Sequence, residues 1–168
     1  MYEYTPKTQK KKEFLIVAIL SVAAAFLFCC STLPSCLYPS LWQLTCVFLL
    51  VAVIMLVSKC LLRSFVYRVA PREDVEGDAP PDFTVTECYG KRSAVVCRIS
   101  VADIEAVTPV TPQNRKALAA MGKGKSVYRY FSELSPQNLC WLTVRDGDNL
   151  FYIRIVADEN LISALQKN

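Results

Sequence analysis

The chain has 168 residues, of which 53% are apolar and 20% are charged, and it contains no histidine. This length excludes a polytopic membrane bundle that also carries a large soluble domain, but it allows one ordinary domain core beside a short membrane anchor. The formal net charge is +4, yet residues 64–168 hold thirteen basic and thirteen acidic side chains, so the surplus lies in residues 1–63. Because a nucleic-acid-binding domain needs its own excess of Lys and Arg, we expect no nucleic-acid partner.

Two apolar runs, separated by a short loop, follow a basic tail at residues 1–13. The first run, residues 14–30, has no charge, and at about 1.5 Å per residue it covers roughly 26 Å of bilayer. The second, residues 41–58, has a similar length, and the long side chain of Lys59 can reach back to the interface. A soluble protein can bury one such run as a core helix, but two in tandem leave no polar face for water. The sequence therefore predicts a transmembrane α-helical hairpin in the lipid bilayer over residues 14–62.

Basic residues flank both runs, whereas the loop at 31–40 carries no charge. By the positive-inside rule, we expect a multi-pass protein of the plasma membrane with both termini in the cytoplasm. The rival interpretation of the first run is a secretory signal peptide with Ala23, Ala24 and Ala25 as its cleavage site. Three apolar residues follow these alanines directly, which is atypical of the end of a signal peptide. The sequence favours a membrane span.

From residue 65 the apolar residues follow a period of two, which is typical of strands. Strands are predicted at 65–69, 83–89, 92–99 and 104–108, and the acidic segment 72–82 is predicted to be an exposed loop because Gly and Pro interrupt it. Gly90-Lys91 forms a hairpin turn in this prediction, with Cys88 opposite Ser93 and Cys97 opposite Thr84. The two thiols would then lie about 13 Å apart along the strands, too far for a disulfide.

A helix is predicted to begin at Thr111-Pro112, where a hydroxyl cap precedes a proline, and to end at Gly122. The residues between have high helix propensity and few apolar positions, so we expect this helix on the surface. A strand at 127–131 follows. The last part of the chain is predicted as a second hairpin turning at Gly147-Asp148 and a closing helix capped by Asp158.

The register of that second hairpin predicts two different faces. The apolar face pairs Val144 with Phe151, Leu142 with Ile153 and Cys140 with Ile155. The opposite face pairs Thr143 with Tyr152 and Trp141 with Arg154, and the second pair is placed for a cation–π contact. The apolar side of the closing helix consists of Leu161, Ile162 and Leu165. We expect this side to pack on a sheet.

No motif predicts catalysis, a cofactor or a metal. Residues 119–126, AAMGKGKS, lack the first glycine of the phosphate-binding loop G-x-x-x-x-G-K-[ST], and the predicted helix before them and strand after them reverse the order that this loop needs. The serines have no G-x-S-x-G motif and no His to activate them. Cys88, Cys97 and Cys140 lack C-x-x-C spacing, and no His completes a ligand set. We expect a protein that is not an enzyme.

The double span that leads into SFVYRVA, the hairpin FTVTECYGKRSAVVCRIS followed by VADIEAV, and the final strand pair with its helix resemble the membrane-anchored bacterial pleckstrin-homology-like families of poorly defined function. The resemblance covers most of the chain. It implies that residues 64–168 form a mainly β domain, an antiparallel sheet of about seven strands with a C-terminal helix, and it supplies no catalytic residues. The Lys and Arg-x-Arg motif with which eukaryotic members bind phosphoinositides is not matched, since Lys91 and Arg92 lie at a turn and the second arginine of the motif is missing beside Arg98.

Two functions follow as expectations. The first is a membrane-anchored interaction module whose cytoplasmic domain docks a protein partner or self-associates. The alternative is an accessory subunit of a membrane transport or envelope-homeostasis complex. The uncharged spans offer no residue for an ion path. Basic residues close to the membrane are expected to contact anionic headgroups at about 1 kcal/mol each. These are Lys10, Lys11, Lys12, Lys59, Arg63, Lys91, Arg92, Lys123 and Lys125.

Overall fold

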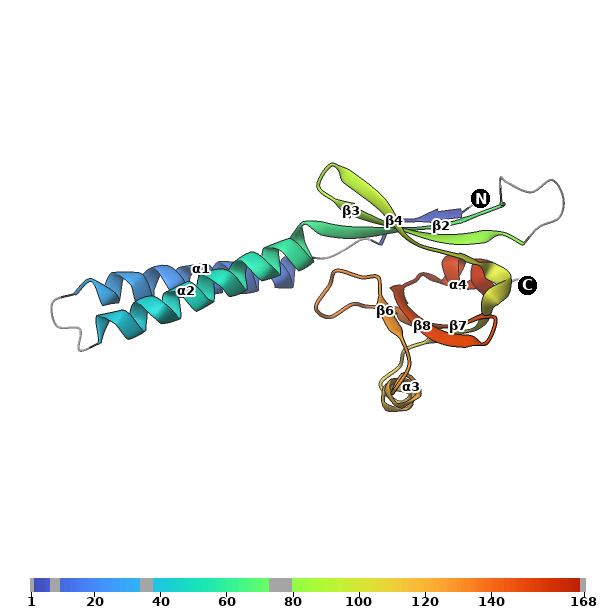
Figure 1. The fold of residues 1–168 in the computed structure, drawn as a ribbon. Coiled ribbons are helices and arrows are strands. Elements are labelled where there is room, and N and C mark those ends of the chain that lie inside the picture. Colours follow the sequence, from blue (N-terminus) through green and yellow to red (C-terminus); the bar gives the residue numbers. More distant parts are fainter. Residues whose placement is uncertain (1, 7–9, 34–37, 73–79, 167–168) are drawn as a thin grey trace. The chain divides into compact units, whose positions relative to one another are not determined.

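The computed structural model describes residues 2–6, 10–33, 38–72 and 80–166 of the chain. Contacts between Cα atoms divide it into two compact units (Figure 1). The hairpin unit comprises Thr8–Arg63 and Ser132–Leu134, and the sheet unit comprises Met1–Lys7, Ser64–Phe131 and Ser135–Asn168.

The hairpin unit contains the two long apolar helices that the sequence predicts. Helix α1 spans Lys11–Ser31, and helix α2 spans Pro39–Leu56 and continues as the π-helix η1, Val57–Leu61. Both are long and apolar enough to cross a membrane, with 21 residues in the first and 23 in the second. The first begins three residues before the predicted start, because lysines favour helix and Glu13 lies in its positively polarised first turn.

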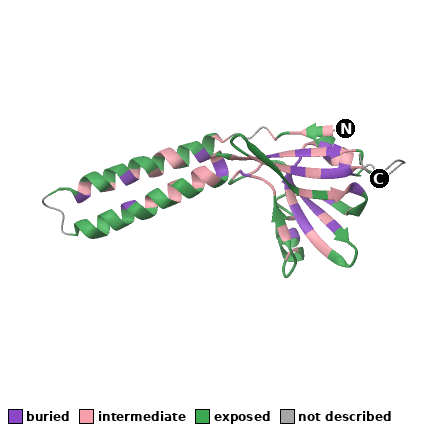
Figure 2. Cartoon of the chain, turned by 45° about the horizontal axis from the view of Figure 1, so that its top comes forward, coloured by how far each residue is buried: buried purple, intermediate pink, exposed green. Residues whose placement is uncertain are grey.

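Most residues of both helices are exposed, and few are buried (Figure 2). Val22 is 70% exposed and Phe48 is 67% exposed, although both are apolar. The helices meet at small residues, where Ala24 and Cys46 are buried and the Cys46 thiol donates to the Ala24 carbonyl at 3.4 Å. Small side chains allow two helix backbones to approach closely. The remaining apolar surface is of the kind that lipid covers.

The first sheet has the strand order β1-β2-β3-β4. Its strands are β1 (Tyr2–Tyr4), β2 (Arg63–Ala70), β3 (Asp82–Tyr89) and β4 (Arg92–Ser100). Strand β1 corrects the prediction that residues 1–13 are only a polar tail. Tyr4 pairs with Tyr67 of β2, and the Tyr2 hydroxyl donates to Asp158 Oδ2 at 2.8 Å. Tyrosine suits a half-buried strand, and both tyrosines pack against the core.

The β3–β4 hairpin has the predicted turn, with Gly90 at φ +60°. Cys88 faces Ser93 as predicted, but Cys97 faces Val85 and not Thr84. The register shifts between Val85 and Thr86, because β4 carries one extra residue, Val96, between the partners of these two residues. This β-bulge is the reason that simple counting from the turn fails beyond it.

Asp82 lies at the start of β3 and corrects the prediction that 72–82 is an exposed loop. The residue is 7% exposed, and its Oδ2 accepts from Arg98 Nε at 2.7 Å. A carboxylate is tolerated at such a buried position because a guanidinium pairs with it. Residues 73–79 of the predicted loop lie outside the described residues.

The second sheet has the strand order β5-β7-β8-β6. Its strands are β5 (Ile104–Pro109), β6 (Val127–Arg129), β7 (Leu139–Asp146) and β8 (Asn149–Val156). Every predicted pair of the second hairpin is confirmed, from Val144 with Phe151 to Trp141 with Arg154. Strand β6 is two residues shorter than predicted and runs parallel to β8.

Helix α3, Arg115–Met121, begins later than predicted. The Asn114 N–H donates to Thr111 Oγ1 at 3.3 Å and the Thr111 N–H donates to Asn114 Oδ1 at 2.8 Å, so these residues form a turn before the helix. The end of the helix at Gly122 is confirmed. The helix is not purely a surface element, because Leu118 is buried against Trp141 and Tyr152.

The core lies between the two sheets and includes helix α4, Glu159–Gln166. Phe83, Leu142, Ile153 and Leu161 are each 0% exposed. The predicted cap is confirmed, since Asp158 Oδ1 accepts from the Leu161 N–H at 2.8 Å. Figure 2 shows the buried residues along the strands of both sheets. The structure thus contains a helical hairpin and a two-sheet unit with a C-terminal helix.

The Tyr67 hydroxyl links the sheets inside this core. It donates to the Tyr130 carbonyl and accepts from the Val156 N–H at 3.4 Å, and the residue is 0% exposed. We expect Tyr67→Phe to lower the free energy of unfolding by about 1–3 kcal/mol, because it removes this partner from the buried Val156 N–H and from the partly buried Tyr130 carbonyl. Denaturant titration of the full chain in detergent, followed by near-UV circular dichroism, measures the change. Tyr128→Phe, at a 48% exposed tyrosine, is the matched control and should be neutral. Equal stability of both variants would contradict the role of this hydroxyl.

Candidate functional site

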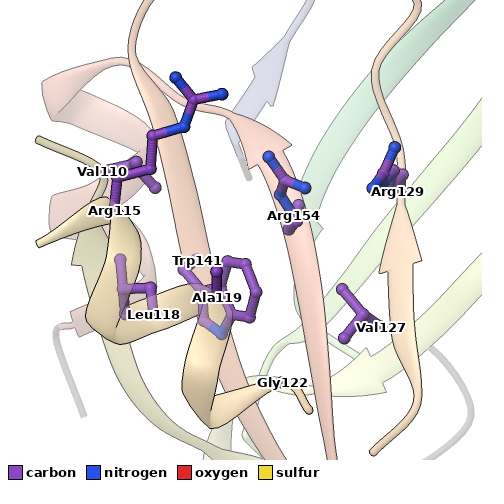
Figure 3. A pocket seen from close by; sticks show the side chains of 9 residues that line it. All are labelled: Val110, Arg115, Leu118, Ala119, Gly122, Val127, Arg129, Trp141 and Arg154. Atoms are coloured by element: carbon purple, nitrogen blue, oxygen red, sulfur yellow. The ribbon is translucent and has the colours of Figure 1, made fainter. Parts of the chain in front are cut away.

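A cavity of about 240 Å³ lies on the face of the second sheet that points away from the core (Figure 3). Helix α3 forms one wall, and β6, β7 and β8 form the base. The strands bring these residues together because alternate side chains of paired strands share a face. Trp141, Arg154 and Arg129 stand side by side in register on that face, from β7, β8 and β6 respectively.

The apolar side of the cavity is built around Trp141. The indole is 5% exposed and packs against Tyr152, with ring centroids 5.5 Å apart. Leu118 of α3 completes this small cluster. The end of α3 approaches so closely that a Cβ on Gly122 would lie 3.0 Å from Val127 Cγ2 and 3.2 Å from Trp141 Cζ2. A glycine at this position is therefore what lets the helix pack against the sheet.

The polar side of the cavity consists of Arg115, Arg129 and Arg154. Figure 3 shows their guanidinium groups on one side of the cavity, with Leu118, Trp141 and Val127 on the other. The predicted cation–π contact is confirmed, since Arg154 Cζ lies 5.4 Å from the Trp141 ring centroid, and it lies 5.5 Å from that of Phe131. The two rings hold the Arg154 side chain in place without neutralising its charge.

The charge in this cavity is one-sided. No Asp or Glu is among the described residues that line it. Burial lowers the pKa of Arg154, and the charges of Arg129 and Arg115 lower it further. The Arg154 Nε is buried and has no hydrogen-bond partner in the described part of the chain. Guanidinium groups bind carboxylates and phosphates through paired N–H donors, so the arrangement is suited to an anion.

The sequence predicts only part of this site. It placed Trp141 opposite Arg154, because both lie in a local hairpin whose turn fixes the register. Arg129 and Arg115 were missed. Arg129 reaches Arg154 through a parallel pairing of β6 with β8, and nothing in the local pattern of residues predicts such a pairing.

Four of the predicted membrane-surface residues belong to the sheet unit. Lys91 and Arg92 lie exposed at the β3–β4 turn. Lys123 and Lys125 follow α3, and Lys125 Nζ lies 5.8 Å from the Tyr152 ring centroid. The order of elements around AAMGKGKS is confirmed as helix before and strand after, the reverse of a phosphate-binding loop.

The other five predicted residues belong to the hairpin unit. Lys10 Nζ donates to the Leu61 carbonyl at 2.8 Å and to the Arg63 carbonyl at 2.9 Å. Burial lowers the pKa of this Lys10 ammonium. Lys11 and Lys12 lie in the first turn of α1, Lys59 lies in η1 and Arg63 begins β2. Contact of the nine residues with headgroups stays a prediction.

An acidic pair lies at the same end of the hairpin unit as Lys10. Glu13 is 5% exposed, and its Oε1 accepts from the Leu134 N–H at 3.0 Å. Burial raises the pKa of the neighbouring Glu133, and the charge of Glu13 adds to this effect. These contacts tie the segment Ser132–Leu134 to the start of α1.

Within the described residues, no group of three or more Cys, Asp or Glu side chains is placed to hold a metal ion. The seven cysteines in this part of the chain are free thiols. No protein family model, no curated protein and no solved structure matches the chain.

Proposed function

We propose that the chain is a non-enzymatic, membrane-anchored interaction module whose sheet unit is a pleckstrin-homology-like domain. Two observations support this fold: two sheets enclose one core, and a C-terminal helix packs into it. The parallel pairing of β6 with β8 departs from an all-antiparallel arrangement. Helices α1 and α2 serve as the anchor, and the basic flanks orient both termini to the cytoplasm.

The surface proposed for docking is the edge strand β4. The proposal rests on the exposure of this edge. Strand β4 is last in the order of the first sheet, so only one side of it is paired with another described strand. Its residues from Arg92 to Val96 are all exposed, and Val95 is 60% exposed although it is apolar. An exposed strand edge offers free N–H and C=O groups to an added strand.

The open part of this edge ends at the bulge. The Tyr130 hydroxyl donates to the Val96 carbonyl at 3.4 Å, so a residue that follows β6 occupies the edge there. A tyrosine hydroxyl is protonated at neutral pH in any case, and burial raises the pKa of Tyr130 to about 12, so this donor also persists well into the alkaline range. The stretch before the bulge, Arg92 to Val95, is therefore the length available to a partner.

The partner that fits this edge is an extended protein segment, from another protein or from a second copy of the chain. Main-chain hydrogen bonds supply its affinity, and contact with Val95 and the exposed Tyr89 supplies selectivity. In the alternative function, an accessory subunit, a membrane protein packs instead on the exposed apolar sides of α1 and α2.

Co-purification tests this proposal. The full chain is co-expressed with two different affinity tags, extracted in mild detergent and purified through one tag, and the bound proteins are identified by immunoblot and mass spectrometry. We expect Val95→Lys to lose a partner that the wild type retains, because a lysine on an edge strand opposes pairing. Met121→Lys, at a residue of α3 that is 57% exposed, is the control and should retain the partner.

The outcomes separate the two functions. Docking at β4 is supported if the wild type retains the second tagged copy, or a soluble protein, and Val95→Lys loses it. A membrane protein that co-purifies equally with the wild type and with Val95→Lys contradicts docking at this edge and favours the accessory subunit.

A further inference from the structure

The arginine-lined cavity on the second sheet is separate from the docking edge on β4 and suggests a second binding activity. Arg129 and Arg154 are direct partners in adjacent parallel strands, and like charges in that relation destabilise a sheet. Arg115 adds a third positive charge from α3. Burial of Arg154 increases the repulsion between these groups, because water screens them less there. The arrangement leaves a positive charge that no described lining residue balances.

The cavity also has a built structure that a solvated patch of arginines lacks. Arg154 is fixed between the rings of Trp141 and Phe131, so its guanidinium needs little ordering when a ligand arrives. The Trp141 indole is 5% exposed and its Nε1 has no hydrogen-bond partner in the described residues. Because Gly122 has no side chain, the end of α3 can lie close to this ring and to Val127.

We propose that this cavity binds a phosphate monoester, with Arg115, Arg129 and Arg154 as the residues that hold the phosphate. A phosphate monoester carries close to two negative charges at neutral pH, and its oxygens match the paired donors of guanidinium groups. A volume of about 240 Å³ is below the usual range for drug-sized ligands, so the cavity suits a small group. The phosphate belongs either to a small soluble molecule or to the headgroup of a lipid such as phosphatidic acid.

Tryptophan fluorescence can test this proposal in the full chain. The protein has two tryptophans, and Trp42→Phe in α2 leaves Trp141 in the cavity as the only reporter. This variant is placed in nanodiscs of phosphatidylcholine and titrated with inorganic phosphate, with sodium chloride at matched ionic strength as the reference. A second set of nanodiscs contains phosphatidic acid. Isothermal titration calorimetry gives an independent measure of phosphate binding.

We expect a saturable change in Trp141 emission with one of the two phosphate sources. Arg129→Gln and Arg154→Gln should each weaken binding about tenfold or more, because each removes a charged hydrogen-bond donor. Lys116→Gln removes the same charge from the exposed side of α3 and should leave binding unchanged. Arg129 is exposed, so its variant is expected to fold even if Arg154→Gln does not.

The outcomes decide both the proposal and the source of the phosphate. Saturation by inorganic phosphate in phosphatidylcholine nanodiscs indicates a soluble ligand, and a change confined to phosphatidic acid nanodiscs and sensitive to Arg129 indicates a lipid headgroup. The proposal is overturned if Trp141 emission does not change in either set of nanodiscs. It is also overturned if Lys116→Gln weakens binding as much as Arg129→Gln does. Because β4 is not part of the cavity, failure here leaves the test of the docking edge unaffected.

Discussion

Leu165→Asp is expected to unfold the sheet unit. Leu165 is 3% exposed, and with Leu161 it joins α4 to the core between the sheets. The change removes a buried apolar side chain and forces a carboxylate into the same place. Among the described residues no Lys or Arg is buried, so a carboxylate in the core would have no buried basic partner and its burial costs several kcal/mol. This is comparable with the whole free energy of unfolding of a typical domain, about 5–15 kcal/mol.

Near-UV circular dichroism and thermal melting of the full chain in detergent measure this effect. Ser163→Asp places the same charge on the exposed side of the same helix and should cost at most about 0.5 kcal/mol, which separates burial from charge. If Leu165→Asp melted at the temperature of the wild type, helix α4 would not be part of the folded core.

The parts of the fold that the sequence predicted correctly are those set by neighbouring residues. The β7–β8 hairpin has a period of two on both strands and turns at Gly147-Asp148, and Gly147 takes the positive φ, +57°, that the first position of such a turn requires. Its register, and with it the contact between Trp141 and Arg154, follows from that turn alone. The cap of α4 at Asp158 is also local.

The parts that it did not predict depend on contacts between distant segments. Strand β1 is three residues long, and it forms because β2, more than fifty residues later, offers an edge and a place for two tyrosine rings. Asp82 is buried because Arg98 reaches it across the hairpin. The bulge at Val96 is one residue in an otherwise regular strand, and apolar alternation does not show where it occurs.

The candidate site divides in the same way. The pair on β7 and β8, Trp141 with Arg154, was predicted from the sequence. The concentration of positive charge was not, because it depends on Arg129 of β6 and Arg115 of α3, which the fold places beside that pair. In the sequence, Arg115, Arg129 and Arg154 are well separated and resemble ordinary surface residues. Three arginines become a site only because the fold leaves them around one cavity without a carboxylate among the described lining residues.

The second large effect is expected from charges placed in the middle of α1 and α2. Val22 and Val51 lie near the centres of the two helices and are 70% and 48% exposed. Their replacement by arginine in the double variant Val22→Arg/Val51→Arg should prevent stable insertion into the bilayer. An arginine near the centre of a span costs about 2.5–3.5 kcal/mol, so the pair costs about 5–7 kcal/mol. We expect the wild type to stay in the membrane pellet after washing with alkaline carbonate, and the double variant to be lost from it.

The control for this experiment is Val95→Arg, which changes the same residue type at an exposed position of β4. It adds an arginine outside the hairpin and should leave the chain in the pellet. The reason for the difference is that Val22 and Val51 are apolar and exposed on the outer sides of two long apolar helices, where an anchor in the bilayer would place them against lipid. Retention of the double variant in the washed pellet, at the level of Val95→Arg, would show that α1 and α2 do not hold the chain in the bilayer.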